Sequence, residues 1–259
     1  MDANTLNQRN AGAEYPASRS PLRLPRAVLF DLDDTLVYGY DAAAGRDLDI
    51  HYESWRTVLA ERGNLLRHEQ YLRHMKGLDH SGCQAYLEGA LGIAGEERVG
   101  LAKSRCYRER MLPRYLRLRP GVGQFLQALR ARDVWLGIYT NAPRANLDST
   151  YAALGLDAWI PRAQALAIDD LHALGLRAKP EPDGLLHVVR QLKLERGELL
   201  YVGDSSADIR AARAAGVAVL VITANYPTAE LTDMGATGTF DSYAELRLED
   251  LPGTVGARD

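Results

Sequence analysis

The sequence predicts an α/β fold: a Rossmann-like core with a parallel sheet and an inserted α-helical cap domain. After residue 119, short apolar runs alternate with helical segments of about ten residues, as in a parallel sheet that helices cover on both faces. A similar apolar run stands at residues 27–31, and a mostly helical block at residues 37–118 separates it from the rest. We therefore assign residues 26–36 and 119–259 to the core and residues 37–118 to the cap.

The amino-terminal half contains an extension, one strand, a loop and several short helices. Residues 1–25 lack periodicity and are rich in Asn, Ala, Arg, Ser and Pro, which predicts a flexible N-terminal extension. Residues 27–31 are apolar and end at acids, which predicts a buried strand. Residues 37–50 are polar with two glycines and predict a loop. Residues 51–117 show helical spacing that glycines interrupt, so we expect several short helices there.

The carboxyl-terminal half contains the alternating strands and helices of the core. The stretch at residues 161–170 is less strand-like than this fold requires, so the pattern does not define the path of the chain there. The predicted helices are residues 122–132, 143–154, 181–194 and 206–215, and the predicted strands are residues 134–140, 199–203 and 217–223.

Composition restricts the class of protein. The chain has 259 residues, 46% of them hydrophobic and 25% charged, which is ordinary for a globular protein. Its net charge of −3 gives no sign of a nucleic-acid partner, and its two cysteines do not make a disulfide framework. The apolar runs are shorter than the roughly 20 residues of a membrane helix, and the N-terminus lacks the apolar region of a secretory signal, so we expect none. We therefore expect a cytoplasmic protein, monomeric or homodimeric, with no membrane or nucleic-acid partner.

The most informative stretch is the end of the first predicted strand, where Asp31, Asp33 and Thr35 follow an apolar run. Alternate residues of an extended chain share a face, so Asp31 and Asp33 can point into one site. Crowding carboxylates in one site is costly unless a positive group lies among them. A hard divalent cation prefers carboxylate oxygens, so this stretch predicts a metal site.

Three further motifs stand at the ends of predicted strands or before a predicted helix. They are Thr140-Asn141, Lys179-Pro180, and Asp204 with Asp208 in the run Gly-Asp-Ser-Ser-Ala-Asp. Each has a simpler interpretation by itself: the acids as helix caps, Thr-Asn as a turn, and the lysine as a solvated surface residue. Together with the first motif and in this order, they resemble the haloacid dehalogenase superfamily of phosphotransferases.

The resemblance implies a metal-assisted reaction on the first motif. Asp31 resembles the nucleophile that forms an aspartyl-phosphate in this superfamily. Asp31, Asp204 and the backbone carbonyl of Asp33 resemble the ligands of Mg²⁺. Asp208 is expected to bind the metal directly or to orient a water molecule bound to it.

The remaining motif residues are expected to handle protons and phosphoryl oxygens. Asp33 resembles the general acid that protonates the leaving group and then the base that activates water. We expect nearby negative charge to help it hold a proton near neutral pH. Thr35 is expected to orient the first motif, and Thr140 and the N–H of Asn141 to hold phosphoryl oxygens. Lys179 is expected to hold the phosphate and to offset carboxylate charge.

The helical insert resembles the cap that closes over the site in this superfamily, which suits a small phosphorylated metabolite better than a phosphoprotein. Lys76, Gly77 and His80 stand where such caps carry a substrate-specificity loop, although an ordinary turn between helices also explains them. Residues 103–119 hold seven basic residues and one acid, the composition of a solvated helix face or of a surface that attracts an anion. Asp34 stands where relatives often have Gly or Asn, and we assign no chemistry to it.

The resemblance favours a Mg²⁺-dependent phosphomonoesterase, because the dehalogenase and phosphonate-cleaving branches lack an acid at the position of Asp33. The fourth motif and the residues after it resemble phosphoglycolate phosphatases, which favours a phosphoglycolate-like substrate. The Thr-Asn-Ala context of the second motif resembles nucleoside 5′-monophosphatases as much, and a sugar phosphomutase uses the same residues. A non-catalytic protein that binds a phosphorylated metabolite is the alternative from a different class.

Overall fold

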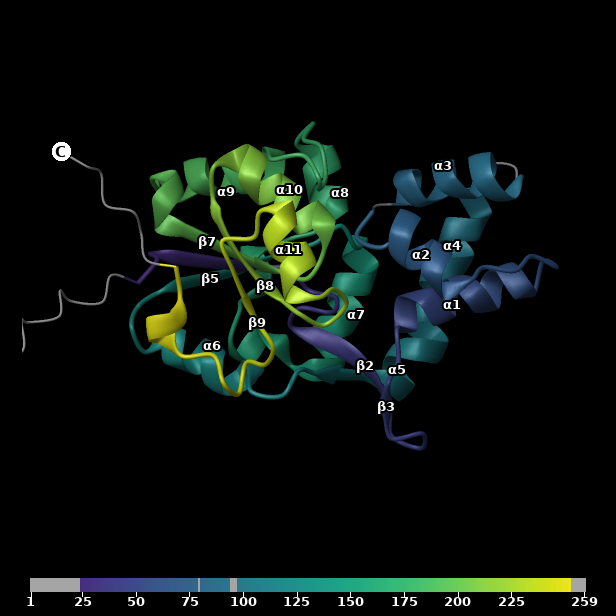
Figure 1. Ribbon diagram of the computed structural model, residues 1–259, viewed down its shortest axis with the longest axis horizontal. Coiled ribbons are helices and arrows are strands. Elements are labelled where there is room, and N and C mark those ends of the chain that lie inside the picture. Colours follow the sequence, from purple (N-terminus) through teal and green to yellow (C-terminus); the bar gives the residue numbers. More distant parts are fainter. Residues whose placement is uncertain (1–23, 79, 94–96, 253–259) are drawn as a thin grey trace, which may run out of the picture.

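A six-stranded parallel sheet forms the centre of the computed structural model, which describes residues 24–78, 80–93 and 97–252 (Figure 1). All the strand pairs of this sheet are parallel, so the α/β fold class predicted from the sequence is confirmed. In spatial order the strands are β6 (Ala165–Leu166), β5 (Trp135–Tyr139), β1 (Ala27–Phe30), β7 (Leu199–Gly203), β8 (Ala218–Ile222) and β9 (Gly238–Phe240).

The central position of β1 follows from its apolar residues, which are fully buried on both faces. Val28 and Phe30 belong to the apolar cluster on one face of the sheet, and Ala27 and Leu29 belong to the cluster on the other face. β1 pairs with β5 on one side and with β7 on the other. Because the three strands run in the same direction, the residues that follow them meet at one edge of the sheet.

Helices cover both faces of this sheet. In the view of Figure 1, α9 and α10 lie above the strands and α6 lies below them. Single turns of 3-10 helix lie at residues Leu156–Ala158, Arg162–Gln164, Arg196–Glu198 and Leu248–Asp250. The core helices are α6 (Val122–Arg130), α7 (Arg144–Leu154), α8 (Ile168–Ala173), α9 (Asp183–Gln191), α10 (Ser206–Ala215) and α11 (Thr228–Met234).

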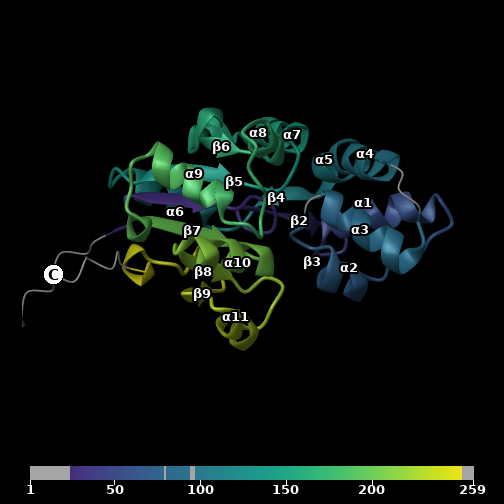
Figure 2. The same cartoon turned by 90° about the horizontal axis from the view of Figure 1, so that it is seen from above.

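The segment between β1 and α6 forms a mostly helical unit beyond one end of the sheet (Figure 2). We keep the name cap for residues 37–118. Its apolar cluster, which includes Trp55, Leu59 and Leu87, is separate from the two clusters of the core. Its helices are α1 (Ile50–Ala60), α2 (His68–His74), α3 (His80–Leu91), α4 (Glu97–Cys106), a π-helical turn (Tyr107–Met111) and α5 (Leu112–Tyr115).

The prediction of a loop at residues 37–50 is wrong, because β2 (Val37–Asp41) and β3 (Arg46–Asp47) lie there. β2 pairs antiparallel with β3 and also with β4 (Leu116–Leu118), with Val37 opposite Leu118. The segment that enters the cap is therefore paired with the segment that leaves it. Local periodicity cannot reveal such a strand, because its partner lies far away in the sequence.

Several short core elements were not expected from the sequence. β6 and α8 occupy the ambiguous stretch before Lys179, and α11 and β9 follow the last strand that we predicted. Most of the N-terminal extension predicted at residues 1–25 lies outside the described residues, which begin at Leu24. None of the helices in the described parts of the chain has the length and apolar character that crossing a membrane requires.

Candidate active site

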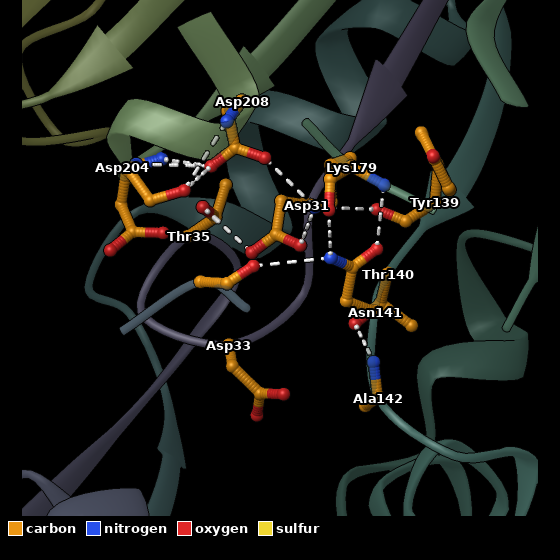
Figure 3. Close-up of polar contacts among 12 residues, drawn as sticks. Asp31, Asp33, Thr35, Tyr139, Thr140, Asn141, Ala142, Lys179, Asp204 and Asp208 are labelled. Carbon is orange, nitrogen blue, oxygen red and sulfur yellow. Dashed lines mark hydrogen bonds and ion pairs between the residues drawn. The ribbon is translucent and has the colours of Figure 1, made fainter. Parts of the chain in front are cut away.

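Asp31 and Thr35 lie in the turn that follows β1 (Figure 3). The backbone N–H of Asp31 donates to the carbonyl of Val202 at 2.8 Å, so the pairing with β7 continues up to this residue. Thr35 is fully buried, and its hydroxyl donates to Asp31 Oδ2 at 3.4 Å. The Asp31 carboxylate is therefore anchored by the strand below it and by the turn beside it.

Lys179 places a buried positive charge among the carboxylates at this edge of the sheet. Its Nζ donates to Asp31 Oδ1 at 2.6 Å and to Asp208 Oδ1 at 2.8 Å. It also donates to the hydroxyl of Tyr201 at 2.8 Å. Burial would lower the pKa of the Lys179 ammonium, but Asp208 and Asp31 raise it above its usual range. Lys179 is therefore charged at neutral pH and offsets part of the carboxylate charge.

Asp208 lies in the first turn of α10, and donors surround its carboxylate. The hydroxyl of Ser205, the N-cap residue, and two backbone N–H groups donate to Oδ2, and the hydroxyl of Tyr201 donates to Oδ1 at 2.9 Å. A Cβ on Gly203 would lie 2.6 Å from Asp208 Cγ, so a larger residue does not fit there. Burial would raise the pKa of Asp208, but Lys179 and these donors lower it below its usual value.

A buried group of three carboxylates is suited to a divalent cation. Asp31, Asp204 and Asp208 each offer an oxygen, and these atoms lie within 4.8 Å of one another. Burial and the neighbouring carboxylates raise the pKa of Asp31, although Lys179 opposes this. Burial and nearby carboxylates also raise the pKa of Asp204 to about 7. Lys179 therefore leaves negative charge uncompensated, and a hard cation that prefers oxygen ligands, such as Mg²⁺, fits this set.

Thr140 and Asn141 follow β5 at the same edge of the sheet. Thr140 is buried, and its hydroxyl oxygen accepts a hydrogen bond from the N–H of Ala142 at 3.0 Å. The side-chain amide of Asn141 donates to the carbonyl of Lys179 at 2.8 Å and accepts from the N–H of Lys179 at 3.1 Å. Asn141 therefore positions the backbone that carries the buried lysine.

Asp33 points away from the other carboxylates, as Figure 3 shows, and faces the cap. Its Oδ1 lies 3.0 Å from His51 Nε2 and accepts from the hydroxyl of Tyr107 at 3.3 Å. Burial would raise the pKa of Asp33, but His51, Lys103 and Tyr107 lower it below its usual value. The expectation that nearby negative charge keeps Asp33 protonated is wrong, because the side chain faces these cap residues instead.

Lys103 extends the contact between Asp33 and the cap. Lys103 is only 6% exposed. It therefore does not belong to the solvated helix face expected for residues 103–119. Its Nζ lies 2.7 Å from His51 Nδ1 and within 6 Å of the ring centres of Trp55 and Tyr107. Burial lowers the pKa of Lys103, and Asp33 opposes this shift. Lys103 on α4 thus faces an imidazole and two aromatic rings instead of water.

Lys76 brings a second buried ammonium from the cap to the core. Its Nζ is paired with the Asp34 carboxylate, and it lies 3.6 Å from Asp204 Oδ2 and 3.8 Å from Asp49 Oδ2. Burial would lower the pKa of Lys76, but these three carboxylates raise it well above its usual value. The positive charge of Lys76 is therefore directed at carboxylates of the protein.

Gly77, next to Lys76, brings the cap loop into contact with the core. Its carbonyl accepts from Asn141 Nδ2 at 3.1 Å. Its φ is +79°, and a Cβ at this position would lie 2.9 Å from Ser205 Oγ. A glycine is thus required both by the backbone conformation and by the close approach. His80, the third residue of the expected specificity loop, begins α3, but its side chain lies outside the described residues.

The core and the cap together line a half-open cavity of about 90 Å³. Such a concave space lined by a few polar groups is typical of a small-molecule site. The core contributes Asp31, Asp33, Thr140, Asn141 and Lys179 to its wall, and the cap contributes His51, Trp55, Tyr71, Lys76 and Lys103.

The sequence motifs identified the core half of this site and missed most of its cap half. Tyr201 could have been found, because it stands two positions before Gly203 and alternate residues of a strand share a face. His51, Lys103 and Tyr107 come from separate parts of the cap and meet at Asp33 only in the folded chain. Their spacing in the sequence carries no signal for that meeting.

Comparison with known proteins identifies the family. A model of the family described as haloacid dehalogenase-like hydrolase matches residues 25–216, which is more than half of the chain. The chain therefore belongs to the haloacid dehalogenase-like hydrolase family. The prediction of an enzyme of the hydrolase class is confirmed.

Individual relatives confirm the resemblance to the phosphatase branch. The phosphoglycolate phosphatase of Rhodospirillum rubrum is 29% identical over 86% of this chain and 90% of that protein. The plasmid protein CbbY of Cupriavidus necator is 32% identical over 76% of this chain and 77% of its own length. A structure of a HAD family hydrolase from Deinococcus radiodurans R1, with bound phosphate and sodium, has a TM-score of 0.63 and 27% identity. It covers 87% of this chain and 94% of that one.

Proposed function

We propose that this protein hydrolyses a small phosphate monoester, depends on Mg²⁺, and forms an aspartyl-phosphate on Asp31. The observation that carries this proposal is the environment of Asp31, a buried carboxylate that Lys179 and Thr35 hold in place. Asp204 and Asp208 lie close enough to share a cation with it. The phosphoglycolate phosphatase of R. rubrum supports phosphoglycolate as the favoured substrate.

Asp31, Asp204 and Asp208 would hold the metal, with the backbone carbonyl of Asp33 as the further expected ligand. When bound, Mg²⁺ would reduce the repulsion between the phosphate dianion and the attacking carboxylate. Lys179 supplies a fixed positive charge beside the Asp31 carboxylate. The same charge would attract the phosphate. Thr140 and the N–H of Asn141 orient the phosphoryl oxygens in line with Asp31.

The reaction proceeds in two displacements at phosphorus. In the first, the Asp31 carboxylate forms a bond to phosphorus as the bond to the leaving oxygen breaks, and Asp33 protonates that oxygen. In the second, Asp33 takes a proton from water, which attacks phosphorus and releases phosphate from Asp31. His51 and Lys103 favour the ionised form of Asp33 that the second step needs. An incoming phosphate dianion raises the pKa of Asp33 and so favours the protonated form that the first step needs.

The test is release of inorganic phosphate from a panel of small esters, with Mg²⁺ and with EDTA. The panel contains phosphoglycolate, sugar phosphates, and purine and pyrimidine 5′-monophosphates. We expect Mg²⁺-dependent release that is greatest for phosphoglycolate. If phosphate release is greatest for a nucleoside 5′-monophosphate, the proposed reaction stands and that nucleotide replaces phosphoglycolate as the proposed substrate. Isomerised sugar phosphate without phosphate release would indicate a mutase, and tight calorimetric binding without any turnover would indicate a binding protein.

A further inference from the structure

Asp34 lies within the first motif, and the proposed reaction assigns no role to its carboxylate. Its φ is +60°, in the left-handed region, where glycine is free of steric cost and aspartate is tolerated. Its backbone carbonyl accepts from Arg119 Nε at 2.8 Å, a contact that any residue could make. The contacts of its side chain are therefore where a carboxylate, rather than a glycine, makes a difference.

The Asp34 carboxylate forms a largely buried ion pair with the ammonium of Lys76. The two side chains are 17% and 4% exposed, so water screens the pair little. The other two carboxylates near this ammonium, Asp204 and Asp49, lie farther away at 3.6 and 3.8 Å. Asp34 belongs to the core and Lys76 to the cap, so the pair connects the two parts in the wall of the cavity that Asp31 also lines.

The cap loop around Lys76, residues Met75–Leu78, touches the core at a second place. There the carbonyl of Gly77 accepts from Asn141, and the backbone of Gly77 lies against Ser205. The loop is thus held from two sides, by neutral contacts at Gly77 and by charge at Lys76. Without the Asp34 carboxylate, the loop keeps its contacts at Gly77, and Asp204 at 3.6 Å is the remaining core carboxylate near Lys76.

We propose that Asp34 is a positioning residue that holds the cap loop Met75–Leu78 closed over the active site by pairing with Lys76. Asp34 lies outside the group of three carboxylates that could hold a cation, so its carboxylate stays available to Lys76 when that group is filled. The ammonium of Lys76 is paired with carboxylates of the protein. Lys76 therefore sets the position of the cap loop in the cavity wall and does not bind the substrate. The kinetic consequence rests on the proposed function, whereas the closure is a property of the fold.

Backbone hydrogen exchange tests the closure without any substrate. Asp34→Asn keeps the shape and the left-handed backbone of the residue and removes its charge. We expect the amides of residues 75–78 to exchange about tenfold faster in this variant, with α1 unchanged. Asp49→Asn is the matched control: it removes a carboxylate 3.8 Å from Lys76, and an Asn can still cap α1 in its place. Equal acceleration in both variants, or none in Asp34→Asn, overturns the proposal.

Kinetics of a double-mutant cycle test the consequence for the reaction. Asp34→Asn, Lys76→Met and the double variant are compared on the best ester of the panel. We expect KM to rise about tenfold in Asp34→Asn, with a smaller change in kcat, and the double variant to be no worse than Lys76→Met. Effects that multiply would show that the residues act separately and would contradict the proposal. If the natural protein hydrolyses no ester, the proposed function fails, and the exchange experiment alone decides the role of Asp34.

Discussion

The core half and the cap half of the active site carry opposite charge. The core brings together Asp31, Asp204 and Asp208, with Lys179 as the positive group that contacts two of them. The cap presents Lys76 and Lys103 to carboxylates that the core leaves at its open side, Asp34 directly and Asp33 through an imidazole. The negative half is suited to a cation, and the positive half completes the charge balance only when the cap is closed.

The two halves of the site shift the pKa values of Asp31 and Asp33 in opposite directions, although these acids stand only two positions apart in the sequence. Burial and neighbouring carboxylates raise the pKa of Asp31, whereas the cap lowers the pKa of Asp33. The same residue type thus acquires two chemical characters from what faces it. The cap therefore does more than line the site, because it also favours one protonation state of Asp33.

The largest effect is expected on the core side. Asp31→Asn removes the nucleophile, so we expect a loss of turnover of about 10⁴-fold or more with the fold intact. Phosphate release and circular dichroism measure the two quantities. Asp233→Asn, which changes an exposed acid on α11, is the matched control and should keep normal rates. Near-normal rates in Asp31→Asn would remove this residue as the nucleophile.

Asp33 should show an effect that depends on the leaving group. In Asp33→Asn the leaving oxygen receives no proton, so we expect losses of about 10²–10⁴-fold for alkyl phosphates. An activated aryl phosphate, whose leaving group needs no proton, should lose far less in its first step. Rates for a series of esters with different leaving-group pKa values provide the measurement. Equal losses across the series would argue against an acid role for Asp33.

A smaller effect is expected when the cap charge beside Asp33 is removed. Lys103→Met keeps the length of the side chain and removes a cation that lowers the pKa of Asp33. The pKa of Asp33 should therefore rise, and because the first step needs protonated Asp33, the alkaline limb of kcat/KM against pH should move to higher pH. An unchanged limb would show that the cap charge does not reach Asp33.

The smallest effect concerns the stability of the metal-free protein. The folded pKa of Asp204 is raised from 3.8 to about 7, so the folded state binds the proton more tightly than the unfolded state does. Stability should therefore fall as pH rises through this window, by about 5 °C in melting temperature between about pH 5.5 and about pH 8. Mg²⁺ should restore it at the higher pH, and Asp204→Asn should remove the part of the slope that Asp204 contributes. Thermal unfolding with EDTA and with Mg²⁺ is the measurement, and the opposite slope would refute the assignment.

The sequence by itself determined the four central strands of the core sheet, β5, β1, β7 and β8, and the core half of the site. The predicted strand at residues 199–203 and helix at residues 206–215 coincide with β7 and α10, because a buried strand and a capped helix are encoded in neighbouring residues. The positions of Asp31 and Asp204 at strand ends follow from the same local pattern. Parallel strands then bring those ends to one edge of the sheet, whatever the rest of the chain does.

Only the tertiary structure decided the cap half. The pairing of β2 with β4, the burial of Lys103 and the contact of Asp34 with Lys76 join residues that are distant in the sequence. The partners of Asp33 and Asp34 at Tyr107 and Lys76 are 74 and 42 positions away. Because the interaction between charges depends on their separation in space and on burial, the protonation of Asp33 was settled by how the cap folds back onto the core.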